Sequence, residues 1–125
     1  MAFTEQMATR TMISGAALTQ FTFVVGPASD GQIDPVSVAG TRASGVVLQS
    51  AAGAGEAVTV AYDGRVTVVT GAAGGIARGD AVAVDAAGKA KKAASTNVIV
   101  GYALEAGAAG QVITIELSRA DKAAA

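Results

Sequence analysis

Residues 57–79, AVTVAYDGRVTVVTGAAGGIARG, contain the patterns that decide the fold class. Apolar residues alternate with others on both sides of Asp63-Gly64, and an Asp-Gly pair between two such runs is a strong signal for a β-hairpin. We therefore predict strands over residues 57–62 and 65–70 joined by a tight turn. The second strand leads into a glycine-rich segment, which raises the question of nucleotide binding.

Residues 70–76, TGAAGGI, resemble the strand-to-helix turn of a short-chain dehydrogenase. In that fold a helix must follow the glycines, because its free N–H groups and its dipole bind the pyrophosphate. Here Gly79 stands where the first helical turns should be, and residues 81–84, AVAV, alternate like a strand. The Tyr-x-x-x-Lys pair of those enzymes is also missing. We expect a surface loop between two strands and no cofactor.

The rest of the chain favours a mainly β fold. Of the 26 Val, Ile and Leu residues, 22 are Val or Ile, whose β-branched side chains suit a pleated sheet better than a helix. Further strands are predicted over residues 20–25, 32–38, 45–50, 81–84, 89–93, 98–104 and 111–117, with a second tight turn at residues 85–88. Strands spaced by roughly ten residues predict a small barrel or sandwich of short antiparallel strands.

Two segments of the chain resemble each other. Residues 45–50 and 55–60 are echoed by residues 101–106 and 110–115, at an offset of 56 residues before an Ala/Gly loop and 55 after it. Two similar strand–loop–strand units are typical of pseudo-symmetric halves of one barrel. Chance similarity in an Ala/Gly/Val-rich chain is the alternative, and the sequence does not choose between them.

The two ends differ from the centre. Residues 1–19 have no regular alternation, and we interpret them as a non-globular N-terminal arm, with partial helix as one option. Residues 20–117 form the predicted β domain, and residues 118–125 are predicted to be a flexible tail. Side chains of the arm that need a surface to cover them are candidate contacts to a partner: Phe3, Met7, Arg10, Met12 and Ile13.

Composition excludes several classes of function. The chain has no His and no Cys, so the usual general base, thiolate chemistry and the commonest transition-metal ligands are missing, and we predict neither an enzyme nor a metal site. A net charge of −1 with scattered charges argues against nucleic acid as a partner. No apolar run approaches the roughly 20 residues of a membrane span. Ala (30) and Gly (16) make the core lean, which favours association with a partner or with further copies.

Residues 79–117 then show a resemblance to a known family. The run GDAVAVDAAGKAKKA, followed by VIVGYALEA at 98–106 and GQVITI at 110–115, is similar to small head decoration proteins of tailed bacteriophages, also called capsid cement. Residues 45–70 resemble the first half of these proteins, so the resemblance covers residues 20–117. It implies a structural protein of the capsid exterior, made in the host cytoplasm, that binds the major capsid protein as a homotrimer at three-fold positions and stabilises the shell. The arm residues then become candidate capsid contacts.

Two other functions stay open at this stage. A lipoyl- or biotinyl-carrier domain is a small β fold that presents a lysine on a hairpin, and Lys89 lies beside the turn at residues 85–88. Another virion part, such as a tail subunit, is the third option. For the arm, binding to the capsid or an adjacent copy and packing on its own barrel are both open.

Overall fold

The computed structural model describes residues 7–26, 31–95 and 97–117, and the side chains from residue 9 onward within these ranges. The strands are β1 (Met7–Ser14), β2 (Phe23–Val25), β3 (Gln32–Pro35), β4 (Gly45–Val47), β5 (Ala57–Val69), β6 (Ala81–Val84), β7 (Ala90–Lys92), β8 (Gly101–Ala103) and β9 (Val112–Leu117). The described ranges contain no helix, which confirms the mainly β prediction and contradicts the option of partial helix within residues 7–19.

All nine strands belong to one sheet, in the order β1-β3-β2-β4-β5-β9-β8-β6-β7. An additional pairing between β1 and β5 closes the first five strands of this order into a barrel. We call β1, β3, β2, β4 and residues 57–62 of β5 the first barrel. Neighbouring strands run antiparallel except β1 and β3, which pair in parallel at Ile13↔Gln32 and Ser14↔Ile33.

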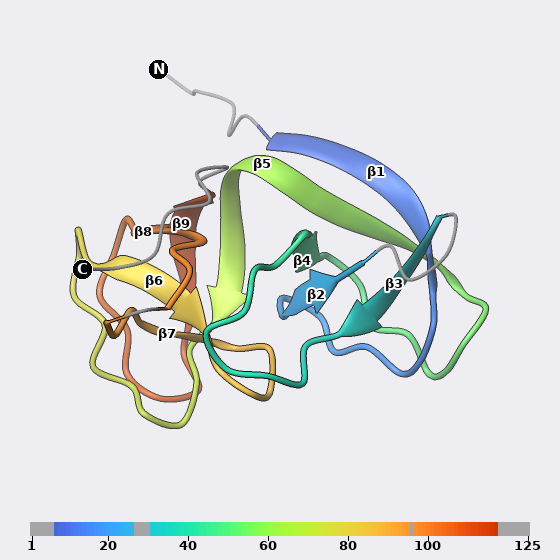
Figure 1. Cartoon of the computed structure of the whole chain (residues 1–125). Coiled ribbons are helices and arrows are strands. Elements are labelled where there is room, and N and C mark those ends of the chain that lie inside the picture. Colours follow the sequence, from blue (N-terminus) through green and yellow to red (C-terminus); the bar gives the residue numbers. More distant parts are fainter. Residues whose placement is uncertain (1–6, 27–30, 96, 118–125) are drawn as a thin grey trace, which may run out of the picture.

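The predicted hairpin at Asp63-Gly64 is wrong. β5 runs without interruption from Ala57 to Val69, and it bends sharply at its middle (Figure 1). Gly64 has a φ of 91°, and its N–H donates to Asp63 Oδ1 at 3.0 Å, so the Asp-Gly pair forms a local bend rather than a reversal. The two halves do not pair with each other because the first half pairs with β1 and β4 and the second half with β9.

Beyond the bend, the chain builds a second barrel with the same connections. Its members are residues 64–69 of β5, β7, β6, β8 and β9. A parallel bridge, Thr70↔Ala90, joins the end of β5 to β7, as Ser14↔Ile33 joins β1 to β3. The second turn prediction is confirmed at this place: β6 and β7 pair antiparallel around residues 85–88, where Asp85 Oδ1 accepts from the N–H groups of Ala87 and Lys89.

The registers of the two barrels match pair by pair. Equivalent pairs in the first and second barrels are Met12↔Val58 and Val68↔Ile113, Val46↔Ala61 and Tyr102↔Glu116, Phe23↔Val46 and Ala81↔Tyr102. Each residue of the first barrel precedes its counterpart in the second by 55 to 58 residues. This range includes the offsets of 56 and 55 seen in the sequence (46 to 102, 61 to 116). The internal echo is therefore a structural repeat and not a coincidence of composition.

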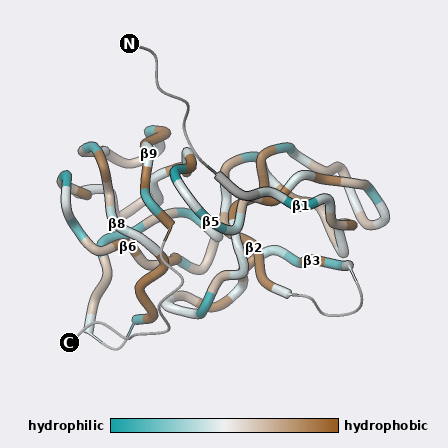
Figure 2. Tube along the Cα trace, turned by 90° about the horizontal axis from the view of Figure 1, so that it is seen from above, coloured by the Kyte–Doolittle hydropathy of each residue, from teal (hydrophilic) through white to brown (hydrophobic). Residues whose placement is uncertain are grey.

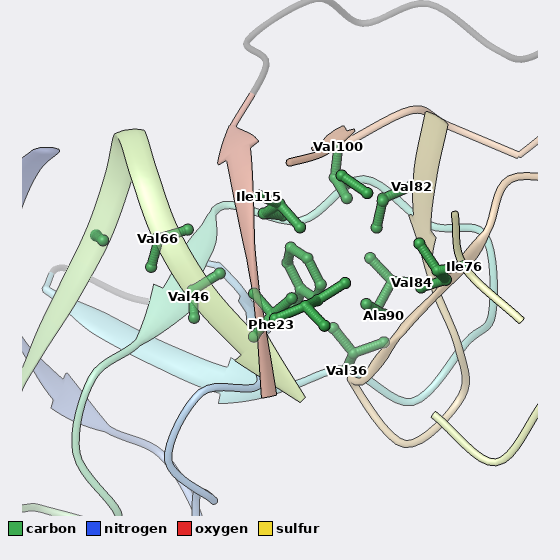
Figure 3. Close-up of a cluster of buried hydrophobic side chains, with 14 residues drawn as sticks. Phe23, Val36, Val46, Val66, Ile76, Val82, Val84, Ala90, Val100 and Ile115 are labelled. Atoms are coloured by element: carbon green, nitrogen blue, oxygen red, sulfur yellow. The ribbon is translucent and has the colours of Figure 1, made fainter. Parts of the chain in front are cut away.

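Each barrel has an apolar centre. Inside the first barrel lie Leu18, Val24, Ile33, Val47, Ala51, Val58 and Val60, with Met12 packed against them. A larger cluster fills the second barrel and continues onto the outer side of the first, where Phe23, Val46 and Ala61 belong to it (Figure 3). β5 contributes to both clusters and lies between the barrels, as seen from above in Figure 2. The pair of barrels thus shares one strand and one interface core.

Candidate interaction surfaces

The glycine-rich segment is a loop of the repeat. Residues 70–76, TGAAGGI, are the counterpart of residues 14–18, SGAAL, with Gly74 and Gly75 inserted. Both segments end in an antiparallel bridge, Leu18↔Ala51 in the first barrel and Ile76↔Gly107 in the second. No helix follows Ile76, and Asp80 Oδ2 instead accepts from the N–H of Ala77 at 2.8 Å in a local turn. The prediction of a loop between strands is confirmed, and the helix that a pyrophosphate site requires is replaced by β6.

Side chains with chemistry are scattered over the described structure. No group of three or more Asp, Glu, Cys or His residues that could hold a metal ion occurs within it. Lys89, the residue on which the carrier alternative depends, follows the turn; the exposed tip is formed by Ala86 and Ala87. No helix in the described ranges is long and apolar enough to cross a membrane. The candidate functional sites considered below are therefore exposed surfaces.

The first of these surfaces is the outer side of β1. Residues 7–14 of the expected arm form this strand, and its hydrogen bonds to β5 make it a wall of the first barrel. For residues 7–14 this corresponds to the alternative in which the arm packs on its own barrel. Phe3 lies outside the described residues, and Met7 is placed in β1 opposite Gly64 while its side chain is not described.

The three remaining candidate contacts of β1 differ in their surroundings. Arg10 is exposed, and its guanidinium carbon lies 5.4 Å from the centre of the Tyr62 ring, a distance at which a cation is attracted to an aromatic face. Met12 packs against the cluster inside the first barrel. Ile13 is 42% exposed at the far end of the strand, where its N–H donates to Gly31 O at 2.7 Å. Arg10 and Ile13 therefore offer the larger surfaces.

A second surface, on β8 and β9, was not predicted from the sequence. Tyr102 is 46% exposed, Leu104 36% and Val112 49%, and all three lie on β8, on β9 or directly after β8. They alternate with the buried Ala103 and Ile113, so they point away from the centre of the second barrel. The alternation in residues 101–104 was a signal for this outward face. Its significance follows from the first barrel, where Val46, the counterpart of Tyr102, is fully buried and Leu48, the counterpart of Leu104, is partly buried.

Comparison with known proteins gives the family. The sequence matches the family model described as phage cement protein over residues 4–118. The chain belongs to the phage cement protein family. No curated protein matches the sequence. The fold of this cement protein is similar to the crystal structure of the head fiber gp8.5 N base in bacteriophage phi29, with a TM-score of 0.73, 20% sequence identity, and coverage of 94% of this chain and 98% of that chain.

Membership of this family confirms the resemblance seen in residues 20–117 and extends it to residues 4–118. The cement protein is a structural, capsid-associated protein of the bacteriophage virion. The comparisons give no support to the carrier alternative. Both barrels and the strand between them lie within the matched residues, so the repeat is part of the region that the family shares.

Proposed function

We propose that this cement protein binds the outer surface of the capsid as a homotrimer at local three-fold positions, contacts the major capsid protein, and stabilises the shell. The observation that carries the proposal is the match to the cement family over residues 4–118. The structure is compatible with such a role because it exposes apolar side chains on strand faces, among them Ile13, Tyr102 and Val112. A modest contact repeated at many equivalent sites sums to strong retention through multivalency.

The contact with the shell is proposed to involve the N-terminal segment and the adjoining side of β1. Phe3, Met7 and Ile13 are the apolar candidates for this contact, because Met12 packs inward. Removal of residues 2–14 would also remove β1 and open the first barrel, so it does not test binding cleanly. Removal of residues 2–6 eliminates Phe3 and leaves every pairing of β1 in place.

The experiment is co-sedimentation of the purified protein with heads that lack it. The full chain is expected to bind at a fixed ratio to the shell subunit, and deletion of residues 2–6 or the substitution Ile13→Asp is expected to weaken binding while circular dichroism stays unchanged. Val38→Asp is a matched control, since Val38 is 64% exposed and lies outside the strands. Normal binding by both variants would refute the proposed contact. Absence of binding by the full chain would refute the proposed function.

A further inference from the structure

The two barrels of one chain meet in a buried apolar interface. On the first barrel, a row of paired residues across β2, β4 and β5 faces the second barrel: Phe23, Val46 and Ala61. All three are buried, with exposures of 1%, 0% and 0%, in the cluster that fills the second barrel. In Figure 3, Val46 lies beside Val66, and Phe23 lies among residues of both barrels, with Ile115, Val84 and Ala90 contributed by the second.

The second barrel carries the same row, and two of its three residues are exposed to solvent while the third is half-buried. The equivalents of Phe23, Val46 and Ala61 are Ala81, Tyr102 and Glu116, paired in the same register across β6, β8 and β9. Tyr102 is 46% exposed and Glu116 is exposed, and Leu104 beside them is the equivalent of the partly buried Leu48. A face that is a tight interface in one repeat is thus open to solvent in the other. An exposed aromatic next to a leucine is typical of a protein contact site.

The side of this interface that the second barrel contributes also has a counterpart, which lies at the end of the first barrel. Val66 of the second barrel pairs with Ile115 and belongs to the interface cluster. Its counterpart is Arg10, which pairs with Val60 in the same way. Leu117 packs against the same cluster, and its counterpart Tyr62, which follows Ala61 as Leu117 follows Glu116, lies under the Arg10 guanidinium. The end of the first barrel therefore presents an arginine and a tyrosine where the second presents valine and leucine.

We propose that copies of this chain associate head to tail, with the Arg10–Tyr62 end of one first barrel on the Tyr102–Glu116 face of the next second barrel. The contact repeats between chains the arrangement that exists within the chain. The substitutions are complementary: the row that contains Glu116 meets the end that contains Arg10, and Tyr102 offers a ring to the same guanidinium. The polar groups on both sides explain how these faces remain soluble when uncovered. Such a heterologous contact closes into a ring when the rotation between copies is suitable.

Chain geometry agrees with this arrangement. Within the chain, β5 passes from the first barrel to the second through Asp63 and Gly64. In the contact between copies, Leu117 at the end of β9 of one copy occupies the position that Tyr62 has within the chain. Thr9 of β1 in the next copy occupies the position of Arg65. Tyr62 and Arg65 are three residues apart, so at most about 10 Å separates the matching points of two neighbouring copies. The inference rests on the self-association part of the proposed function and is independent of the contact with the shell.

Site-directed disulfide formation tests the contact, because the chain has no cysteine of its own. Arg10→Cys, isotopically labelled, is mixed with unlabelled Tyr102→Cys under oxidising conditions, and the dimers are separated by mass. Random collision gives one half of the dimers as the mixed 10–102 species. The proposal expects the mixed species in clear excess over this share. Arg78→Cys is the control for Tyr102→Cys, because Arg78 is exposed in the loop before β6, and its mixture with Arg10→Cys is expected to give only the random share.

A charge exchange gives a second readout that does not depend on disulfides. Arg10→Glu and Glu116→Arg are each expected to lower the average mass at high concentration in sedimentation equilibrium, and the doubly exchanged chain is expected to recover it. Thr9→Cys replaces Arg10→Cys if the latter does not fold. A random share of the mixed dimer, or an excess of 102–102 dimers, would overturn the proposal, the latter indicating a two-fold contact. Since the protein is tested alone, a failure here is distinct from a failure of capsid binding.

Discussion

Phe21 and Gly79 occupy equivalent turns in the two barrels, and both have a positive φ, 63° and 91°. Their hydrogen bonds are also equivalent, since the N–H of Phe21 donates to Val47 O and that of Gly79 to Ala103 O, both at 2.8 Å. Phe21 is the only residue other than glycine with a positive φ in the described ranges. The repeat therefore imposes this backbone conformation on both turns, and glycine meets it without steric cost only in the second.

Substitution of Gly79 is expected to be destabilising for backbone reasons alone. A Cβ at this position would meet no atom within 4 Å, so Gly79→Ala changes conformational strain and not packing. A left-handed conformation costs an alanine about 1–2 kcal/mol, and the free energy of unfolding should fall by that order. Gly53→Ala is the control, because Gly53 has the same open space and no positive φ, and it is expected to be neutral or slightly stabilising. Equal effects of the two substitutions in urea unfolding would contradict the interpretation.

The strands of the β domain could be predicted because their apolar residues alternate and their turns contain Gly and Asp. Every predicted strand contains or overlaps an observed one, and the turn at residues 85–88 was placed correctly. The Asp63-Gly64 pair was misinterpreted because the same dihedral angles serve a tight turn and a bend within a strand. Which of them forms depends on the partners of the flanking residues, and these partners, β1 and β9, are distant in sequence.

The first strand and the interaction surfaces depend on tertiary structure in the same way. β1 has weak alternation because Arg10 and Ile13 are exposed and Met12 is only partly buried, and a register shift at Ala8/Thr9 disturbs its pattern. Its position follows from pairing with β5, about 50 residues later in the chain. The Tyr102 face could not be singled out because its sequence pattern matches that of Val46, which is fully buried. Only the arrangement of the repeats separates a covered face from an open one.

Thr70 and Ser14 are equivalent buried residues, but only the hydroxyl of Ser14 forms hydrogen bonds among the described residues. Ser14 Oγ donates to Gly53 O at 2.6 Å and accepts from the N–H of Glu56 at 3.1 Å. Thr70 Oγ1 is buried without a hydrogen-bond partner among the described residues. Since an unpaired buried hydroxyl costs about 1–3 kcal/mol, Thr70→Val is expected to raise the free energy of unfolding. Ser14→Ala is expected to lower it by about 1 kcal/mol. A destabilising Thr70→Val in thermal unfolding would show that the hydroxyl is satisfied.

Binding to heads should depend little on ionic strength. The chain has nine basic and ten acidic residues with a net charge of −1, so long-range attraction contributes little to its retention. At about 1 M salt the Debye length is about 3 Å, and charge attraction between exposed groups is largely screened. Decorated heads sedimented at low salt and at that concentration are expected to carry the same amount of protein. Loss of the protein at high salt would show that charged contacts hold it.

A cement role also predicts an effect on filled heads. Contacts that bridge shell subunits oppose their separation under the pressure of packaged DNA, so heads without the protein should release DNA at a lower temperature. The measurement is the fluorescence of a DNA-binding dye during heating of heads with and without the added protein. The deletion of residues 2–6 serves as the control if it binds weakly. Equal release temperatures with and without bound protein would separate capsid binding from stabilisation.

The last prediction concerns Phe23, the aromatic residue at the centre of the contact between the barrels. It is 1% exposed and lies among residues of both barrels, including Val46 and Ile115 (Figure 3). Truncation of a buried Phe to Ala costs about 3–5 kcal/mol, because transfer energy is lost and a cavity remains. In a chain with a lean core this is a large part of a stability of about 5–15 kcal/mol. Phe23→Ala is therefore expected to lower the urea midpoint strongly.

Val24→Ala is the matched control, since Val24 is the next residue on β2, is equally buried, and points into the first barrel. Its smaller side chain should cost less, and it leaves the contact between the barrels intact. Phe23→Ala removes the side chain that links the two barrels, so it should also lower the cooperativity with which the two barrels unfold. We expect separate unfolding of the barrels in Phe23→Ala but not in Val24→Ala. It would be seen as fluorescence transitions that do not coincide when Tyr62 and Tyr102 are followed separately, each in a chain whose other tyrosine is replaced by Phe. Coincident transitions in both variants would show that β5 alone couples the barrels.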